Sequence, residues 1–445
     1  MEIFYRTLEI INYICCAIST VLFAIQLIYI LFIWLPPKHF KESTNYHKMA
    51  VLIVARNESD VIGETVKSLL DQQTYPKDRF DVFVCADNCT DDTEAKAKAA
   101  GAITYTHSDP DPAHHRAAFP VQYAMNEILK DYPGVYDAFI RFDADNHACP
   151  DYLKRMNDAF SLGCDICRPY ESSTNPTQNN WTKVSAIYYV RDSRIACNFR
   201  ERCHMDSMLT GAGMLVSTKI IQEIGGWDAL SMSDDSEFTM KRMMGKHRIH
   251  YVADAIVYED QPSNAKDTFA RVSRMGHGLN DVFWKIGWRF AGHFFVSGRI
   301  SFIDLFFQMA FVPIGFMACT WYPCYYIYYI LGHLINAFVP NGNWLAGVHE
   351  ISGQLLTAGR SQDILWTLLW GIVGVIASFY VIYVLQAWLA LTLSKKHLGL
   401  KSLKGYWSGI FLSPIFMIFY GIADTLGVLM KPKWAKVHRN PGKKS

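Results

Sequence analysis

The sequence predicts an α/β domain enclosed between membrane-spanning helices. Three observations predict this class: apolar segments of membrane-spanning length lie towards both ends of the chain, the middle is charged, and strand and helix patterns alternate through that middle. Hydrophobic residues make up 51% of the 445 residues and charged residues 19%, where roughly a quarter is usual. The net charge of +2 gives no reason to expect a nucleic-acid partner.

The N-terminal segment, residues 1–37, is predicted to be a membrane anchor. No charged residue occurs from Ile10 to Pro37, and this length is sufficient to cross a hydrocarbon core of about 30 Å. The segment lacks the basic start and the small-residue cleavage site of a signal peptide, so we expect it to be retained. Lys38, Lys41 and Lys48 follow, and the positive-inside rule then places the next domain in the cytoplasm.

Residues 48–280 are predicted to form this cytoplasmic domain around a largely parallel sheet. The apolar, β-rich runs that predict its first strands are 50–55, 80–86, 103–106 and 138–140. Helical spacing and capping residues occupy segments between them, and such alternation predicts an open α/β sheet. Ligands of these sheets lie beyond the carboxyl ends of the strands. The polar residues at or just past those ends are therefore candidate site residues: Arg56, Glu58, Asp87, Asp143 and Asp145.

Two carboxylates separated by one residue close the fourth predicted strand, in Asp143-Ala144-Asp145. Residues i and i+2 at a strand end point the same way, so both carboxylates can reach one hard cation. Such a pair suits a Mg²⁺ ion that also binds substrate phosphates. Taken alone, the pattern fits a solvated turn better than a metal site. Its placement beside the other strand ends favours a metal site.

The chain returns to the membrane after the α/β domain. Residues 281–300 mix aromatic residues with Lys285, Arg289 and His293, and this composition predicts an amphipathic helix in the membrane interface. Residues 301–430 are predicted to form four transmembrane helices from three apolar stretches. The stretches are 305–339, 364–393 and 406–430.

The number four follows from topology. The basic tail, residues 431–445, should be cytoplasmic, and a single N-terminal span then requires an even number of later spans. Pro313 and Pro323 interrupt the first stretch, and dividing it into two short spans meets that requirement. Asp304 and Asp424 either face a polar lumen or lie at the membrane edge. The division also places a group of lysines outside: Lys395, Lys396, Lys401 and Lys404.

Six short motifs follow one another in a fixed order. They are Val54-Ala55-Arg56-Asn57-Glu58, Asp87-Asn88-Cys89-Thr90-Asp91-Asp92-Thr93, Asp143-Ala144-Asp145, Gly211-Ala212-Gly213, Gly225-Gly226-Trp227-Asp228 and Ser233-Asp234-Asp235. The set resembles the inverting family 2 glycosyltransferases, and is most similar to their membrane-integrated branch of cellulose, chitin and hyaluronan synthases and ceramide glucosyltransferase. The resemblance covers residues 48–300 and implies a GT-A-type fold, a Rossmann-like mixed sheet with flanking helices.

The resemblance implies a binding site for a UDP-sugar. Asp87 would bind the uridine base or the ribose, and Arg56 and Glu58 would line the same pocket. Asp143 and Asp145 would hold the diphosphate through Mg²⁺ or Mn²⁺, a Lewis-acid role.

The resemblance also implies an acceptor side. Asp235 matches the last acid of the family's Thr-Glu-Asp motif and would take the proton from the acceptor hydroxyl as general base. Gly211 and Asp234 are expected on the same side. Trp227 is expected to stack on an acceptor sugar, with a core tryptophan as the alternative.

One segment departs from the family pattern. Membrane synthases carry Gln-X-X-Arg-Trp after the last strand, and the matching residues here are Arg271-Val272-Ser273-Arg274-Met275. In the family this motif accompanies processive polymerisation, so its alteration argues against a long polymer as product. Arg271 and Arg274 can clamp the diphosphate, or they are surface charges on a membrane-facing helix.

We therefore expect a multi-pass enzyme of the cell membrane with its catalytic domain in the cytoplasm. It would transfer a sugar from a UDP-sugar to a glycan or lipid acceptor, with inversion to a β-linkage, in polysaccharide or glycolipid synthesis. Membrane lipids are expected partners, and nucleic acid is not. The alternative, motivated by the altered segment, is a catalytically inactive scaffold or partner subunit of a glycan-synthesis complex.

Overall fold

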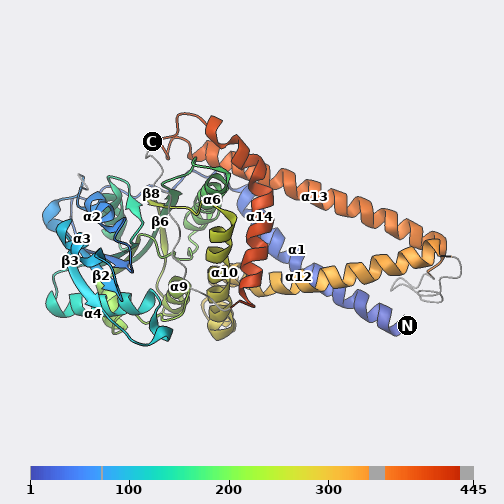
Figure 1. Cartoon of the computed structure of the whole chain (residues 1–445), viewed down its shortest axis with the longest axis horizontal. Helices are drawn as coiled ribbons and strands as arrows, with labels where there is room; N and C mark the ends of the chain where they lie inside the picture. The colour runs from blue at the N-terminus through green and yellow to red at the C-terminus, as the bar shows by residue number, and fades with distance from the viewer. Residues whose placement is uncertain (1, 72–73, 340–355, 431–445) are drawn as a thin grey trace.

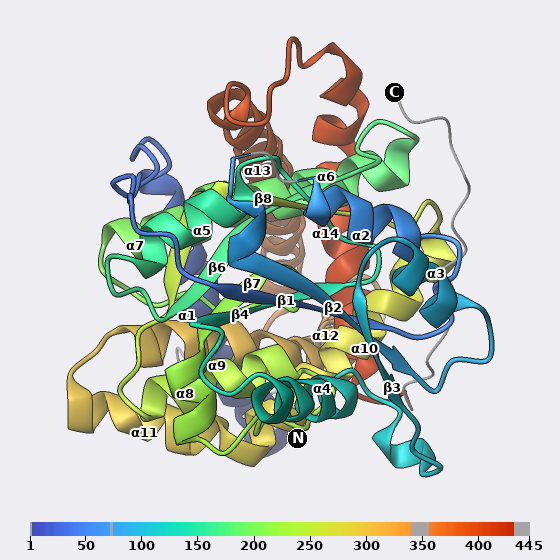
Figure 2. The ribbon, with the colours of Figure 1, turned by 90° about the vertical axis from the view of Figure 1, so that its left-hand side faces the viewer.

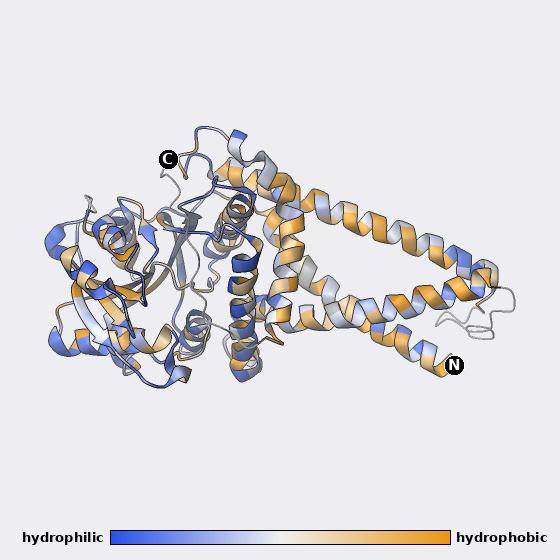
Figure 3. Cartoon of the chain, viewed as in Figure 1, coloured by the Kyte–Doolittle hydropathy of each residue, from blue (hydrophilic) through white to orange (hydrophobic). Residues whose placement is uncertain are grey.

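Long helices extend from one side of an α/β domain (Figure 1). The computed structural model describes residues 2–71, 74–339 and 356–430. The predicted basic tail, residues 431–445, lies outside this range. The three extended helices are α1 (Glu2–Leu31), α12 (Ser301–Phe338) and α13 (Ala358–Ser394), and a fourth, α14 (Trp407–Gly427), lies across their base. Hydrophobic residues predominate along these four helices in Figure 3, whereas the α/β domain is mixed.

The sheet has eight strands in the order β3-β2-β1-β4-β7-β6-β8-β5. The first four strands along the chain pair in parallel, β7 is antiparallel to both of its neighbours, and β8 pairs in parallel with β6 and antiparallel with β5. This arrangement confirms the predicted mixed sheet. The strands are β1 (Met49–Ala55), β2 (Phe80–Asp87), β3 (Ile103–His107), β4 (Ala138–Asp143), β5 (His147–Ala148), β6 (Ile166–Ser173), β7 (Met214–Ser217) and β8 (His250–Glu259).

The register of the parallel strands brings their polar ends together. Met49 pairs with Phe80 on one side and with Ala138 on the other, so the strands β1, β2 and β4 begin level. They also end level, with Ala55 opposite Ala86 and Val54 opposite Asp143. The first polar residues after these strands are therefore neighbours at one edge of the sheet.

Helices cover both faces of the sheet (Figure 2). Alternate residues of β1 point to opposite faces: Val51 and Ile53 pack with helices α2, α3 and α5, and Leu52 packs with α4, α8 and α9. Two π-helical segments, Asp192–Cys197 and Phe283–Gly287, interrupt the helices on the membrane side. The helices are α2 (Ile62–Leu70), α3 (Thr93–Ala99), α4 (Ala118–Asp131), α5 (Tyr152–Phe160), α6 (Asn180–Arg191), α7 (Asn198–Arg202), α8 (Thr218–Glu223), α9 (Asp234–Met244), α10 (Ala265–Val282) and α11 (Trp288–Ser297), with 3-10 turns at Lys77–Arg79, Pro112–His114 and Lys404–Tyr406.

The predicted division of residues 305–339 into two spans is wrong, because α12 is one helix of 38 residues through Pro313 and Pro323. Each proline removes one backbone hydrogen bond, and the remaining backbone groups of this apolar segment keep their hydrogen bonds within the helix. Among the described residues, three helices after the α/β domain are long and apolar enough to cross a membrane, where four were predicted. They are α12, α13 and the helical stretch Lys404–Gly427, which contains α14.

The segment after α13 returns to the α/β domain. The hydroxyl of Tyr170 in β6 donates to Ser394 Oγ at 3.2 Å, and the side chain of Ser408 lies 2.9 Å from Asn180 Oδ1 of α6. The lysines between residues 395 and 404 therefore lie on the side of the α/β domain, and not on the far side as the division into four spans required.

The helix α14 packs closely on α10 through two glycines. A Cβ atom on Gly276 of α10 would overlap the backbone of Asp424 and come within 2.6 Å of its Oδ1. A Cβ atom on Gly427 of α14 would come within 3.0 Å of Ser273 Cα and overlap that residue's carbonyl. These glycines permit the short distance between the two helices.

The predicted interfacial helix, residues 281–300, contains the second π-helical segment and α11. Phe290 is buried against the domain, whereas Trp284, Trp288 and Phe295 are exposed. One apolar side is thus left uncovered by protein. Its place in a membrane interface stays a prediction.

Candidate active site

A cavity of about 1290 Å³ begins at the carboxyl ends of the strands and continues between α12, α13 and α14. It has three parts. The part at the strand ends, called the donor end after the role that the resemblance implies, contains Arg56, Glu58, Asp87, Asp143, Asp145, Arg271 and Arg274. The middle compartment contains Glu171, Tyr188, Tyr189, Asp192, Thr210, Tyr420 and Asp424. The apolar end contains Phe311, Ile314, Ala318, Phe379, Ile418 and Ile422.

Asp87 closes β2 and is 3% exposed at the donor end. Its Oδ1 lies 2.8 Å from Nδ1 of His107 and accepts a 2.8 Å hydrogen bond from Asn88 Nδ2. His107 was not singled out from the sequence, although it ends the third strand, whose register places it opposite Asp87. A strand-end histidine beside a strand-end acid was the signal that could have found it.

Arg56 and Glu58 lie on the loop that follows β1. Arg56 Nη2 is 3.2 Å from Nδ1 of His115, which also lines the donor end. The backbone N–H of Glu58 donates to Thr93 Oγ1 at 2.9 Å, and this contact fixes the loop against the start of α3. The structure brings both predicted residues to the cavity beside Asp87.

Asp143 ends β4, and Asp145 lies in the tight turn that follows. The backbone N–H of Asp143 donates to Asn146 Oδ1 at 2.9 Å, and Gly211 borders the same carboxylate. No group of three or more His, Cys, Asp or Glu side chains that could hold a metal exists within residues 2–71, 74–339 and 356–430. Two carboxylates fit a cation that takes its other ligands from phosphate oxygens and water, as Mg²⁺ does.

Arginines balance the acids of the donor end. Arg141 is buried and pairs with Asp234 at 2.5 Å, and burial raises the pKa of Asp143 against the opposing charge of Arg141. Arg271 pairs with Glu259 at 2.5 Å. Burial lowers the pKa of Arg274, and the charge of Arg271 adds to this effect.

Arg271 and Arg274 therefore line the cavity, which corrects the alternative that they are surface charges. Their contact with a diphosphate stays a prediction.

Asp234 and Asp235 begin α9, where a helix N-terminus favours negative charge. Burial and the neighbouring charge of Asp234 raise the pKa of Asp235 to about 6. Its Oδ1 accepts a 2.7 Å hydrogen bond from the backbone N–H of Ser236. A carboxylate with this pKa is ionised at neutral pH and is a stronger base than an ordinary aspartate. Asp234 also lines the cavity, but Arg141 holds its Oδ2.

The prediction that Trp227 stacks on an acceptor sugar is wrong. Its side chain is fully buried, and its ring is stacked on Phe238 with centroids 4.2 Å apart. The turn Gly225-Gly226 directs the tryptophan under α9, into the core shared with α4. Trp227 thus supports the helix that carries Asp235, and does not face the cavity.

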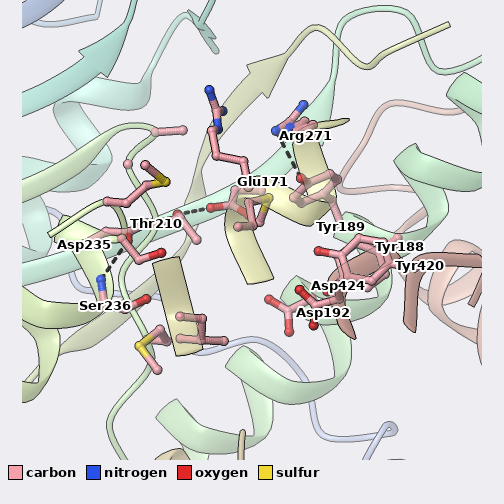
Figure 4. Close-up of a pocket in the computed structure, with 18 of the residues that line it drawn as sticks. Glu171, Tyr188, Tyr189, Asp192, Thr210, Asp235, Ser236, Arg271, Tyr420 and Asp424 are labelled. Atoms are coloured by element: carbon pink, nitrogen blue, oxygen red, sulfur yellow. Dashed lines mark hydrogen bonds between the residues drawn. The ribbon is translucent and has the colours of Figure 1, made fainter. Parts of the chain in front are cut away.

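The middle compartment was largely missed from the sequence. Figure 4 shows its side chains between Asp235 and the membrane helices. Tyr188, Tyr189 and Asp192 belong to α6 and the π-helical segment, where no motif marked them. Asp424 of α14 lines the compartment, which agrees with the interpretation that it faces a polar lumen. Asp304 is not among the residues that line the cavity, and it pairs with Arg200 Nε at 2.8 Å.

Comparisons with known proteins agree with this geometry. The sequence model described as "Glycosyltransferase like family 2" matches residues 47–278. The probable glycosyltransferase YdaM of Bacillus subtilis is 26% identical over 284 residues, which cover 61% of this chain and 64% of that protein. The beta-monoglucosyldiacylglycerol synthase of Synechocystis is 25% identical over 236 residues, which cover 52% and 48%. The chain thus spans between about half and two thirds of the length of these relatives.

Among solved structures, the chain is similar to the mannosyltransferase PcManGT of Pyrobaculum calidifontis, solved in complex with GDP-Man and Mn²⁺. The TM-score is 0.53 at 14% identity, with 88% of this chain and 99% of that chain covered. At this identity the likeness shows the fold alone.

Proposed function

The chain belongs to the family 2 glycosyltransferases, and from this premise we propose that it transfers a sugar from a UDP-sugar to the hydroxyl of an acceptor drawn from the membrane. The observation that best supports this proposal is the continuity of one cavity. It runs from the strand ends, past Asp235, to the apolar faces of α12, α13 and α14. The relatives named as beta-monoglucosyldiacylglycerol synthases also support a lipid acceptor.

The donor end holds the nucleotide. Asp87, fixed by His107, binds the base or the ribose, and Arg56 and Glu58 line the same pocket. Arg271 and Arg274 face the diphosphate and offset its charge. Asp143 and Asp145 are the residues that would hold Mg²⁺ or Mn²⁺. When bound, such a cation supplies Lewis-acid stabilisation of the leaving diphosphate.

Asp235 acts as the general base. Its carboxylate accepts the proton of the acceptor hydroxyl while the hydroxyl oxygen forms a bond to the anomeric carbon. The bond from that carbon to the diphosphate breaks on the opposite face, and the nucleoside diphosphate leaves. This single displacement inverts the anomeric centre and gives a β-linkage from an α-linked donor.

The altered segment at Arg271 and Met275 does not favour an inactive scaffold. Asp87, Asp143 and Asp235 all line the cavity, so the acids that the reaction needs are in place. The pairing of Arg271 with Glu259 gives this residue a defined position beside the donor end.

The orientation that we propose places the α/β domain in the cytoplasm. The helices α1, α12 and α13 cross the membrane, and α14 lies at its cytoplasmic surface. Basic residues flank these helices on the side of the α/β domain, as the positive-inside rule requires. They are Lys38, Lys41, Lys48, Lys395, Lys396, Lys401 and Lys404.

The purified full-length chain in lipid nanodiscs tests the proposal. It would be incubated with a panel of UDP-sugars, native membrane lipids and Mg²⁺ or Mn²⁺, and release of UDP would be measured. We expect release with at least one donor and none with Asp235→Asn. Absence of release with every donor would contradict the proposal.

A further inference from the structure

We propose that the acceptor carries a sugar of its own, and that the middle compartment binds this sugar. The inference rests on the proposed function, because it concerns the acceptor half of the same cavity. The compartment lies between Asp235 and the apolar end, so whatever presents a hydroxyl to Asp235 must occupy it. Its walls come from α6, the π-helical segment and α14 (Figure 4).

Three tyrosines supply flat surfaces in the compartment. The rings of Tyr188 and Tyr420 are stacked with centroids 4.6 Å apart and planes at 22°, which joins α6 to α14. Tyr189 lies beside them, and its hydroxyl accepts a 3.1 Å hydrogen bond from Arg271 Nη2 of the donor end. Tyrosine rings offer an apolar face and a polar tip, a combination that suits the C–H faces and hydroxyls of a sugar.

Carboxylates supply hydrogen-bond acceptors in the same compartment. Arg168 is buried and holds Glu171 at 3.2 Å and Asp192 at 2.8 Å, so one arginine orients two carboxylates. Asp424 lines the same compartment, and none of the ion pairs found among the described residues involves it. Carboxylates accept hydrogen bonds and donate none, so they match an occupant that is rich in hydroxyl groups.

A bare lipid alcohol does not match this set. Diacylglycerol offers one free hydroxyl, which Asp235 requires, and its ester oxygens cannot donate to a carboxylate. Glu171 and Asp192 share Arg168, and Thr210 donates to Glu171, so these two carboxylates have partners inside the protein. Filling the compartment with acyl chains would remove water from Asp424 without supplying a hydrogen-bond donor, which is costly. A pyranose in the compartment replaces the lost water with hydroxyl donors.

The apolar end argues for a lipid behind that sugar. Phe311, Phe379 and Ile418 line it, and Phe311 and Ile418 are also among the exposed apolar side chains. A polysaccharide passing along these side chains would lose its hydrogen bonds to water. Acyl chains form no hydrogen bonds with water, so they lose none there. The acceptor that fits the whole path is a glycolipid with its sugar in the middle compartment and its chains between α12 and α14.

Binding of four matched acceptors tests the inference. The acceptors are dioctanoylglycerol and its monoglycosyl forms with glucosyl, galactosyl and mannosyl heads, presented to the full chain in nanodiscs with UDP. We expect at least one glycosylated form to bind about tenfold more tightly or better, because it alone donates to the carboxylates. Equal or tighter binding of dioctanoylglycerol than of every glycosylated form would overturn the inference.

Two cavity variants and one control variant test whether the middle compartment causes the preference for the glycosylated acceptor. Tyr188→Leu and Asp424→Asn should each reduce the preference for the glycosylated acceptor severalfold, whereas Tyr13→Leu, on the exposed face of α1, should keep it. UDP binding and thermal unfolding report that each variant is folded. An unchanged preference in both folded cavity variants would overturn the inference.

The two failures are separable. Preferential binding without any UDP release from UDP-sugars would contradict the proposed function and leave the sugar compartment supported. UDP release with no preference between the acceptors would support the proposed function and contradict the sugar compartment.

Discussion

The donor end and the middle compartment share one cavity but are built differently. The donor end is built on the sheet: Asp87 and Asp143 are the last residues of β2 and β4, and the register of both strands with β1 between them holds these ends level. The middle compartment is formed by packed helices: Tyr188 of α6 stacks on Tyr420 of α14, and these two helices are far apart in the chain. A sheet edge fixes positions by backbone hydrogen bonds, whereas a helix interface fixes them by side-chain fit. The first suits a constant donor chemistry, and the second allows acceptors to differ among relatives.

We expect the largest effect from replacing Asp235, which lies between the two regions. Asp235→Asn should lower kcat about 10³-fold, because the amide cannot accept the acceptor proton. UDP-sugar binding should remain near that of the unchanged protein, since the donor end keeps its residues. Steady-state kinetics with a calorimetric binding measurement check this. A variant with kcat within a few fold of the original would exclude Asp235 as the base.

We expect the second largest effect from a change confined to the donor end. Asp143→Asn should lower kcat about a hundredfold, because one carboxylate of the proposed cation site is lost. Chelation of divalent metal should have a similar effect on the original protein and be reversed by Mg²⁺ or Mn²⁺. Acceptor binding measured without donor should not change. Full activity after exhaustive chelation would refute the assignment of Asp143 and Asp145.

The support of Asp87 can be tested without touching the acid itself. His107→Leu removes the partner 2.8 Å from Asp87 Oδ1 and should raise KM for the UDP-sugar roughly tenfold. KM for the acceptor should stay constant, because His107 belongs to the sheet half of the cavity. An equal rise in both constants would show that the two regions are not separate.

The pH dependence reports on Asp235. Burial and the charge of Asp234 raise its pKa to about 6, so the proton binds below that pH and the base is lost. The rate should be level above neutrality and fall roughly tenfold per unit below about pH 6. The profile of kcat at saturating metal and donor measures this. A level rate down to pH 4.5 would be inconsistent with an aspartate base in this environment.

We expect the smallest effect from a change in the packing between α10 and α14. Gly276→Ala should cost about 1–3 kcal/mol of stability, because its Cβ overlaps the backbone of Asp424. Acceptor KM should rise severalfold as α14 moves, with donor KM unchanged. Gly292→Ala is the matched control, since nothing lies within 4 Å of its Cβ position. If both variants behave alike, the close packing of α10 and α14 does not shape the compartment.

The same contrast explains what the sequence could predict. Arg56, Asp87 and Asp143 follow apolar strand runs directly, so a local pattern was enough to group them. Tyr188, Asp192 and Tyr420 have no local pattern, and tertiary packing alone brings them together. Trp227 shows the opposite error, because a glycine turn followed by an aromatic residue fits either a site or a core. Pro313 and Pro323 suggested a break in α12, but the apolar surroundings favour a continuous helix.

The central claim is that one cavity joins a cytoplasmic sugar donor to a membrane acceptor. The most direct test follows the sugar of a UDP-sugar labelled in its sugar ring, incubated with the full-length chain in nanodiscs of native membrane lipids. We expect the label to appear in the lipid extract in an amount equal to the UDP released, and mass spectrometry to find it on a lipid. Label recovered as free sugar or as a water-soluble polymer, with none in lipid, would contradict it.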